Sequence, residues 1–322
     1  MKSLLKHILV LIILFSGFLW VMPESRAEFC GRWSAGEKTG SLDYTMIDEA
    51  SGIAASSIFP GRLYHINDSG GGPYFFTTDV RGKNAGKIRI NGFDARSSDF
   101  EDVDVGECLS SKSCLFIADI GDNGRKRKFT EILVIQELEN YNGSVTPVKR
   151  LKVVYPDGPR NAEGMALHPN GDIYILTKEE DLDRSEAYPA RLYRLEKARW
   201  ESAGEGPLKL DYVGDIDFTV LGSSDSVYGK IVSSFDIAPD GKSFLVLTYE
   251  NAYEFNIDLS ESALKPAGEM KKGIDYSVIE LDSLLQQESI TYVNGGKEFL
   301  YDTEYHLFGA PIMKVRCLNG QK

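Results

Sequence analysis

The chain has 322 residues, of which 42% are hydrophobic and 26% are charged, so we expect a globular protein with a sizeable core. The formal net charge of -12 argues against nucleic acids and anionic membranes as main partners, because both repel an acidic surface. Length alone suggests about two domains, but a repeat array can run this long as one unit.

The N-terminus has the pattern of a signal peptide. A basic start precedes the apolar stretch 8–22, which is too short for a comfortable membrane span. Residues 25–27 (Ser-Arg-Ala) supply small side chains before a cleavage site. We expect residues 1–27 to be a signal peptide and residues 28–322 to form one secreted or periplasmic domain without a membrane span. An uncleaved N-terminal anchor is the alternative.

Four cysteines in an exported chain favour disulfides. Three pairings are possible. Cys108 and Cys114 lie six residues apart on either side of a turn, which suits a cross-link within a hairpin. That pairing leaves Cys30 with Cys317, which would join the two ends of the mature chain.

A pattern of two strands recurs five times along the chain. Each copy has a short strand, a turn and a more apolar second strand. The copies start at Ser51, Glu101, Glu163, Phe235 and Glu288. Turns such as Pro-Asn-Gly and Pro-Asp-Gly favour hairpins, because glycine and asparagine accept positive φ.

Further stretches of alternating apolar residues follow the copies, for example residues 74–77 and 87–90 after the first. Four strands per unit at this spacing are typical of a β-propeller blade. The sequence therefore predicts an all-β protein, a β-propeller with five blades. Six blades are the alternative, because the long third interval could hide a degenerate blade around residues 215–231.

The ends of the chain predict how the ring closes. The fifth unit has only one further strand, residues 312–317, whereas residues 28–48 precede the first unit without a blade of their own. The economical arrangement is that the N-terminal strand joins the last blade, where a Cys30–Cys317 disulfide would fasten it. Closure also hides exposed strand edges.

Acidic residues recur at one position of the repeat. Alignment on the inner apolar residue of each unit places Glu101, Glu163 and Glu288 at the same point, with Ser51 and Phe235 in the other two blades. Such residues would ring the mouth of the central channel, where propellers carry their sites. Alternatively, these glutamates accept hydrogen bonds from the backbone of the next blade and hold the blades together.

More polar residues gather where the second strand of each unit ends. The candidate metal ligands are Glu101, Glu163, Glu288, Asp119 and Asp102. The candidate ligand-binding residues are Asn67, Asp68, Asp122, Asn123, Lys178, Tyr249, Glu304 and His65. Hard oxygen donors favour Ca²⁺ or another divalent cation such as Mg²⁺ or Mn²⁺ over zinc. A short basic run, residues 125–128, fits a solvated loop better than an anion site.

Four phrases resemble a set found in exported bacterial β-propeller proteins of unknown function. They are residues 65–70 (His-Ile-Asn-Asp-Ser-Gly), 99–103 (Asp-Phe-Glu-Asp-Val), 117–123 (Ile-Ala-Asp-Ile-Gly-Asp-Asn) and 161–165 (Asn-Ala-Glu-Gly-Met). The chain is more remotely similar to gluconolactonase-like and NHL-type propellers. That resemblance implies a divalent metal held in the channel by Glu, Asn and Asp, but Phe235 interrupts the acidic ring in the fourth blade.

Two functions follow from these observations. In the first, the protein is an exported binding or interaction protein whose acidic site, organised by a divalent cation, holds a small molecule, a glycan or a protein. In the alternative, it is a metal-dependent hydrolase of a lactone, ester or phosphoester, with Glu101 or Glu163 as the candidate catalytic base. We favour binding, because the sequence shows no nucleophile motif. Whether the protein is an enzyme is left open.

Overall fold

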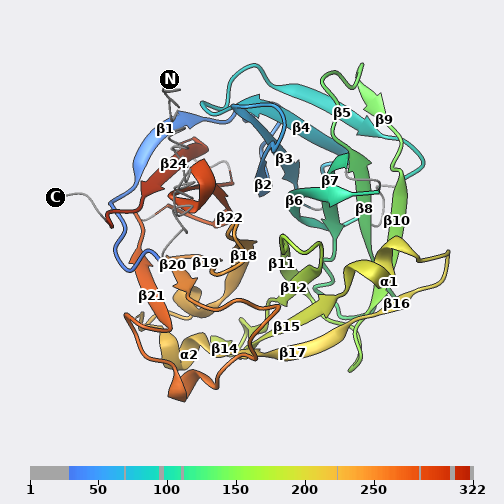
Figure 1. The fold of residues 1–322 in the computed structure, drawn as a ribbon. Helices are drawn as coiled ribbons and strands as arrows, with labels where there is room; N and C mark the ends of the chain where they lie inside the picture. Colours follow the sequence, from blue (N-terminus) through green and yellow to red (C-terminus); the bar gives the residue numbers. More distant parts are fainter. Residues whose placement is uncertain are drawn as a thin grey trace, which may run out of the picture.

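The computed structural model describes residues 29–68, 70–93, 98–109, 112–222, 224–282, 284–304 and 309–319. The expected signal peptide, residues 1–27, lies outside these ranges. In the described part of the chain, no helix is long and apolar enough to cross a membrane. Five antiparallel sheets surround a central axis (Figure 1), so the prediction of a five-bladed β-propeller is confirmed.

Each blade has four strands, which follow one another from the axis outwards. The first blade comprises β2 (Ala50–Ala55), β3 (Arg62–Asn67), β4 (Tyr74–Asp79) and β5 (Gly86–Ile90). The second comprises β6 (Phe100–Cys108), β7 (Lys112–Asp119), β8 (Thr130–Gln136) and β10 (Lys149–Val154). The third comprises β11 (Ala162–Leu167), β12 (Ile173–Thr177), β15 (Ala190–Leu195) and β17 (Asp211–Ile216). The fourth comprises β18 (Val232–Ile237), β19 (Phe244–Thr248), β20 (Asn251–Phe255) and β21 (Tyr276–Glu280). The fifth comprises β22 (Gln287–Val293), β23 (Glu298–Thr303), β24 (Pro311–Arg316) and β1 (Glu37–Ser41).

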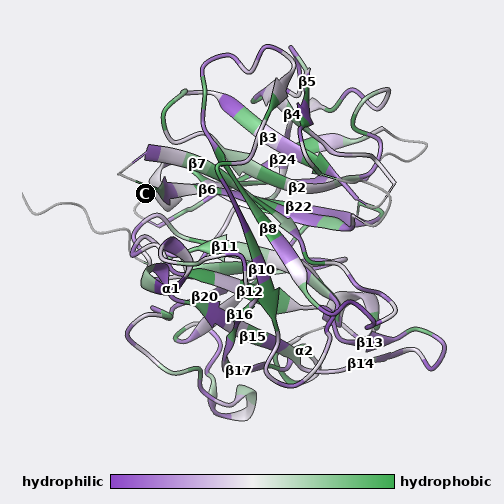
Figure 2. Cartoon of the chain, turned by 90° about the vertical axis from the view of Figure 1, so that its right-hand side faces the viewer, coloured by the Kyte–Doolittle hydropathy of each residue, from purple (hydrophilic) through white to green (hydrophobic). Residues whose placement is uncertain are grey.

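Short elements decorate the ring. The strand β9 (Ser144–Val145) pairs with the edge of the first blade, and β16 (Leu208–Lys209) pairs with the edge of the second. The hairpin of β13 (Glu180–Asp181) and β14 (Glu186–Ala187) projects from one face of the ring (Figure 2). The helical elements are α1 (Lys197–Glu201), α2 (Phe218–Leu221), η2 (Tyr228–Lys230), η3 (Ala267–Glu269) and η4 (Asn294–Gly296). The described part of the connection after β17 contains α2 and η2 but no strand, which excludes the sixth blade.

The N-terminal strand closes the ring as the sequence predicts. Strand β1 pairs antiparallel with β24, the third strand of the fifth blade. Cys30 and Cys317 form a disulfide with an S–S distance of 2.03 Å, next to a backbone bridge between Trp33 and Cys317. Cys108 and Cys114 form the second disulfide, across the hairpin of β6 and β7. Both predicted pairings are therefore confirmed.

The core is divided into five apolar clusters, one between each pair of neighbouring blades. This follows from strand alternation, because successive side chains of a radial sheet face the two neighbouring blades in turn. The cluster between the third and fourth blades is rich in aromatic rings: Phe235 contacts Phe244 edge to face, and Phe244 stacks on Phe255. Burying this apolar surface between blades, not within one blade, is what makes the ring a single unit.

The innermost strands touch through glycines or are joined by aspartates. A Cβ atom on Gly164 would lie 2.5 Å from the Cβ of Phe235 on β18. Aspartates form further links: Asp102 accepts a hydrogen bond from the backbone N–H of Met165 (3.0 Å). Asp104 and Asp236 accept corresponding bonds from Leu167 (2.7 Å) and Tyr292 (2.6 Å). Asp102, a candidate metal ligand, is thus engaged in joining the second blade to the third.

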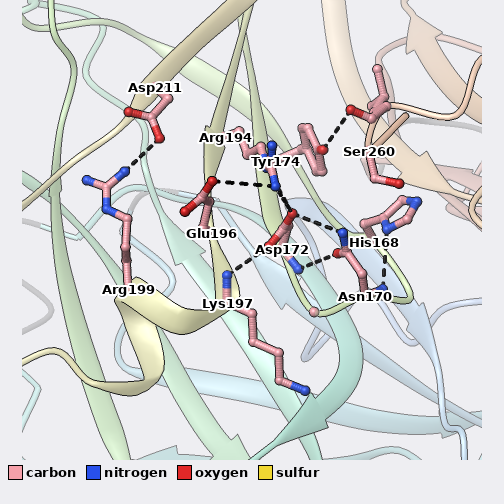
Figure 3. A network of polar contacts seen from close by, with 12 residues as sticks. His168, Asn170, Asp172, Tyr174, Arg194, Glu196, Lys197, Arg199, Asp211 and Ser260 are labelled. Carbon is pink, nitrogen blue, oxygen red and sulfur yellow. Dashed lines mark hydrogen bonds and ion pairs between the residues drawn. The ribbon is translucent and has the colours of Figure 1, made fainter. Parts of the chain in front are cut away.

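A carboxylate also orders the turn between β11 and β12, the two inner strands of the third blade. Asp172 accepts hydrogen bonds from the side chains of Asn170 (3.0 Å) and Arg194 (2.8 Å) and from the backbone N–H of Lys197 (2.8 Å), at the start of α1 (Figure 3). In the same turn, His168 accepts from the backbone N–H of Asn170 (3.2 Å), and its Nε2 lies 3.3 Å from a carboxylate oxygen of Asp258 in the fourth blade. His168 therefore links two blades.

Candidate functional site

Every innermost strand contains a β-bulge at the same point. The register of each inner pair shifts there by one residue, and such bulges re-aim side chains. The extra residues are Ser51, Glu101, Glu163, Ser233 and Glu288. The three glutamates predicted to share one position therefore do so.

The alignment of the fourth blade from sequence is wrong. Ser233, not Phe235, is the bulged residue there, and Phe235 packs in the core two residues later. The sequence alignment matched Ile237 to the inner apolar residue of the other blades. A slip of two residues keeps the same face of a strand, so the apolar pattern alone could not reveal the error.

Polar side chains from all five blades gather at one end of the channel. We call this region the acidic mouth. It consists of Asp68, Asp99, Glu101, Glu163, Glu288 and Glu304 with Lys178 and Tyr249. Three members are bulged residues, and Asp68, Lys178, Tyr249 and Glu304 directly follow the second strands of their blades. The sequence thus predicted seven of the eight members but missed Asp99, although it stands only two residues before Glu101.

Three carboxylates of the acidic mouth converge. One oxygen atom each of Asp68, Asp99 and Glu101 lies within 4.8 Å of the others. Gly121 leaves the space for this cluster: a Cβ atom there would collide with Oε1 of Glu101 and lie 2.5 Å from Oδ2 of Asp99. The backbone N–H of Gly121 also donates to the carbonyl of Asp99 (3.2 Å). The space next to Gly121, which we call the cradle, therefore exists only because position 121 has no Cβ atom.

Asp119 holds Asp99, one member of this cluster, in position. Its carboxylate accepts hydrogen bonds from the Arg127 guanidinium (3.0 and 2.5 Å) and from the backbone N–H of Asp99 (2.8 Å). Both oxygens are thus engaged by the chain itself. Asp119, a candidate metal ligand from sequence, fixes the position of Asp99 instead of joining the three converging carboxylates.

A second group in the acidic mouth surrounds Lys178. Its Nζ lies 3.1 Å from Oε1 of Glu163 and donates to the hydroxyl of Tyr249 (2.7 Å). Glu163 also accepts from the side-chain amide of Asn161 (3.3 Å). Burial raises the pKa of Glu163, and the positive charge of Lys178 opposes this increase. Glu163 is thus a buried carboxyl group beside the ammonium of Lys178.

Burial and mutual repulsion raise the pKa values in the acidic mouth. Burial, followed by the charges of Glu163 and Asp68, raises the pKa of Glu101 well above its usual range. Burial and Asp68 also raise the pKa of Asp99 to about 6 and that of Glu304 to about 7. These carboxyl groups of the acidic mouth therefore keep their protons to a higher pH than exposed carboxyl groups do. The reason is that burial and neighbouring negative charges both disfavour the ionised form.

The other predicted ligand-binding residues have structural partners. Asn67 donates to the carboxylate of Asp48 (2.9 Å), and Asp122 accepts from the backbone N–H groups of Lys126 (2.9 Å) and Arg127 (2.7 Å). Asn123 accepts from the amide of Asn161 (3.1 Å) and is exposed next to the mouth.

His65, also predicted to bind a ligand, lies in the core. Its side chain is fully buried, with Nε2 2.9 Å from Oγ1 of Thr78 and Nδ1 3.6 Å from a carboxylate oxygen of Asp302. Asp302 belongs to the fifth blade, so this contact joins the first and last blades. Complete burial keeps His65 away from the solvent at the mouth.

The raised pKa values predict how stability depends on pH. A carboxyl group whose pKa is higher in the folded than in the unfolded state binds its proton more tightly when folded, so the stability it contributes is lost as pH rises. For Asp99 and Glu304 this window extends from about pH 4, the pKa of unfolded carboxyl groups, to about pH 7. We expect the melting temperature in EDTA to fall between pH 4 and pH 7, and Glu304→Gln to reduce the slope. A flat or rising profile would contradict the assignment.

Comparisons with known proteins do not identify a family for this chain. No protein-family model matches the chain, and no curated protein matches its sequence. Among solved structures, the chain is similar to a gluconolactonase from Xanthomonas campestris, with a TM-score of 0.46 and 9% sequence identity. The similarity covers 87% of this chain and 89% of that chain. A likeness at this level is no basis for assigning an activity.

Proposed function

We propose that the protein is an exported binding protein whose acidic mouth holds a divalent cation that organises the binding site. The observation that carries the proposal is the convergence of Asp68, Asp99 and Glu101 around the space left by Gly121. The two disulfides support folding outside the cytoplasm, where such bonds persist.

The chemistry of the three converging groups fits a hard cation. All are carboxylates, and both cysteine pairs are oxidised, so Ca²⁺ suits the site better than zinc. When bound, the cation would offset the repulsion among the carboxylates and accept further oxygen ligands. Ca²⁺ takes about 6–8 oxygen ligands, more than three carboxylates supply by one atom each. The remaining positions are available to oxygen atoms of a bound molecule.

The residues around the cluster favour binding of a polar ligand at the rim. Tyr249, which accepts the hydrogen bond of Lys178, contacts Tyr228 edge to face at 6.3 Å between ring centroids. Tyr228 is 53% exposed and so offers an apolar ring beside the charged groups. Carboxylates, an ammonium and an exposed ring can contact a small molecule, a glycan or a protein side chain. The acidic character argues against a nucleic acid.

Cation binding is tested by calorimetry and by thermal unfolding. At about 100 times the dissociation constant, Ca²⁺ should stabilise the wild type by about 2.7 kcal/mol relative to NaCl of equal ionic strength. Gly121→Ala fills the cradle and Asp68→Asn removes one carboxylate, so both should abolish most of the gain. Asp183→Asn removes a charge from the tip of the β13–β14 hairpin and serves as the control. Equal responses in all four proteins, or none in the wild type, would contradict the site.

A hydrolase is the second candidate, favoured by the burial of Glu101 and Glu163 near Lys178, which raises the pKa of both carboxyl groups. A carboxyl group with a raised pKa can accept and return a proton, as a general base does. If the protein is an enzyme, it should turn over a member of a panel of lactones, esters and phosphoesters in the presence of Ca²⁺, Mg²⁺ or Mn²⁺. Glu163→Gln should then abolish turnover while cation binding persists. The absence of turnover across the panel would leave binding as the function.

A further inference from the structure

A cavity lies between the second blade and the segment that leads into the third. It has a volume of about 130 Å³. We call it the basic cavity and define it by five lining residues: Arg127, Lys128, Thr130, Tyr155 and Arg160. Arg127 and Lys128 end the basic run of the sequence, Thr130 begins β8, Tyr155 follows β10, and Arg160 stands shortly before β11. The site is thus assembled from two separate segments, residues 127–130 and 155–160.

Three buried donors of the basic cavity lack a hydrogen-bond acceptor among the residues that the structure describes. They are the hydroxyl of Thr130, the hydroxyl of Tyr155 and Nε of Arg160. Thr130 and Tyr155 are 2% and 9% exposed. The Thr130 hydroxyl is close enough to lower the pKa of Tyr155, which burial raises, but the two groups are not in hydrogen-bonding geometry. Buried donors are normally paired, so three together indicate a missing acceptor.

Positive charge surrounds these donors and is held in place. The Arg127 guanidinium is fixed by Asp119 and by the carbonyl of Gly121 (2.9 Å). Arg160 is fixed by Asp157 (2.8 Å). The carboxylate of Asp122 also lines the cavity, but its oxygens accept backbone N–H groups of the basic run. Lys128 stands exposed at the rim and carries no ion pair in the described structure.

We propose that the basic cavity binds a tetrahedral oxyanion, phosphate or sulfate, either free or as the end group of a larger molecule. Such an anion offers only acceptors, which is what two hydroxyls and Nε of Arg160 require. Arginine is the side chain best suited to phosphate geometry. The cavity volume of about 130 Å³ leaves room for several water molecules and so for one such group. The basic run therefore contributes to an anion site, in contrast to the solvated loop that its sequence favours.

Calorimetric titration with sodium phosphate, at ionic strength matched with NaCl, tests the site. We expect one saturable site in the wild type. Tyr155→Phe keeps the ring that packs on Tyr193 and removes one donor, so binding should weaken about tenfold, as for the loss of one hydrogen bond to a charged group. Arg160→Lys keeps the charge but loses Nε, and binding should weaken similarly.

Arg150→Gln is the matched control. Arg150 lies on β10 of the same blade and pairs with Glu131 at the surface, away from the cavity lining. Its removal should change phosphate affinity less than twofold. A second titration with glycerol 3-phosphate separates the two sources of the anion: tighter binding than phosphate indicates an end group of a larger ligand, and weaker binding indicates a free anion.

Two results would overturn the proposal. One is the absence of saturable phosphate binding by the wild type. The other is an equal loss of affinity in Arg150→Gln and Tyr155→Phe, which would reveal a general effect of charge. Thermal unfolding without phosphate checks the variants: Tyr155→Phe should melt no lower than the wild type, because the hydroxyl it removes has no partner in the phosphate-free protein.

Discussion

Replacing Cys30 and Cys317 together by alanine is expected to lower the free energy of unfolding by about 5 kcal/mol, because this disulfide closes a very long loop. The two cysteines are 287 residues apart in sequence. Without the bond, the unfolded chain regains nearly all its conformational freedom, whereas the folded ring loses only one fastening of β1. Strand β1 still pairs with β24, so the ring should remain closed. Urea unfolding monitored by circular dichroism measures the loss.

The second disulfide is the matched control. Cys108 and Cys114 are six residues apart and lie in a hairpin that is already paired on both sides. The same entropic reasoning gives about 2 kcal/mol for so short a loop. Equal losses in the two double variants would contradict the view that ring closure, not local bracing, is the main role of the Cys30–Cys317 bond.

Gly164→Ala is expected to destabilise the protein by about 3 kcal/mol, the upper range for overpacking in a well-packed core. The new methyl group would lie 2.5 Å from Cβ and 3.1 Å from the backbone nitrogen of Phe235. These atoms belong to β18, the innermost strand of the next blade, so relief requires moving one inner strand away from another. The shift of the urea midpoint at constant slope measures the effect.

Gly204→Ala provides the comparison for Gly164→Ala. A methyl group on Gly204 would have no neighbouring atom within 4 Å, and this glycine does not have a positive φ. Alanine there should change stability by less than about 0.5 kcal/mol. If the two variants unfold at the same urea concentration, the close packing of β11 against β18 does not limit stability.

Much of the architecture could be predicted because it depends on local signals. Turns such as Pro-Asn-Gly and Pro-Asp-Gly mark hairpins wherever they occur, and apolar alternation marks strands on either side of them. Counting strands then showed that the last blade lacked one strand and that the N-terminus had one strand without a blade. Strand β1 takes the missing place. The cysteine pairing followed from the six-residue spacing of Cys108 and Cys114, which left Cys30 with Cys317, and the strand count agreed with it. Local chemistry and simple counting were sufficient for these features.

The site could be predicted only where it follows the repeat. Glu101, Glu163 and Glu288 share a bulge, and Lys178 and Tyr249 follow equivalent strands, so their spacing in sequence translates into proximity. Asp99 lies outside the repeat and joins the converging carboxylates only because Asp119 and Gly121 hold it there. His65 carries no sequence signal for its complete burial against Asp302.

By itself, the sequence determined the five repeats, the closure of the ring, both disulfides and the repeated glutamates, because each follows from local patterns or from counting strands and cysteines. Only the tertiary structure decided that Ser233 replaces Phe235 at the fourth bulge, because a slip of two residues in the alignment leaves the apolar pattern unchanged. It alone brought Thr130, Tyr155 and Arg160 together in the basic cavity. Those donors come from separate segments, and whether a buried donor has an acceptor depends on the packed chain around it, not on neighbours in sequence.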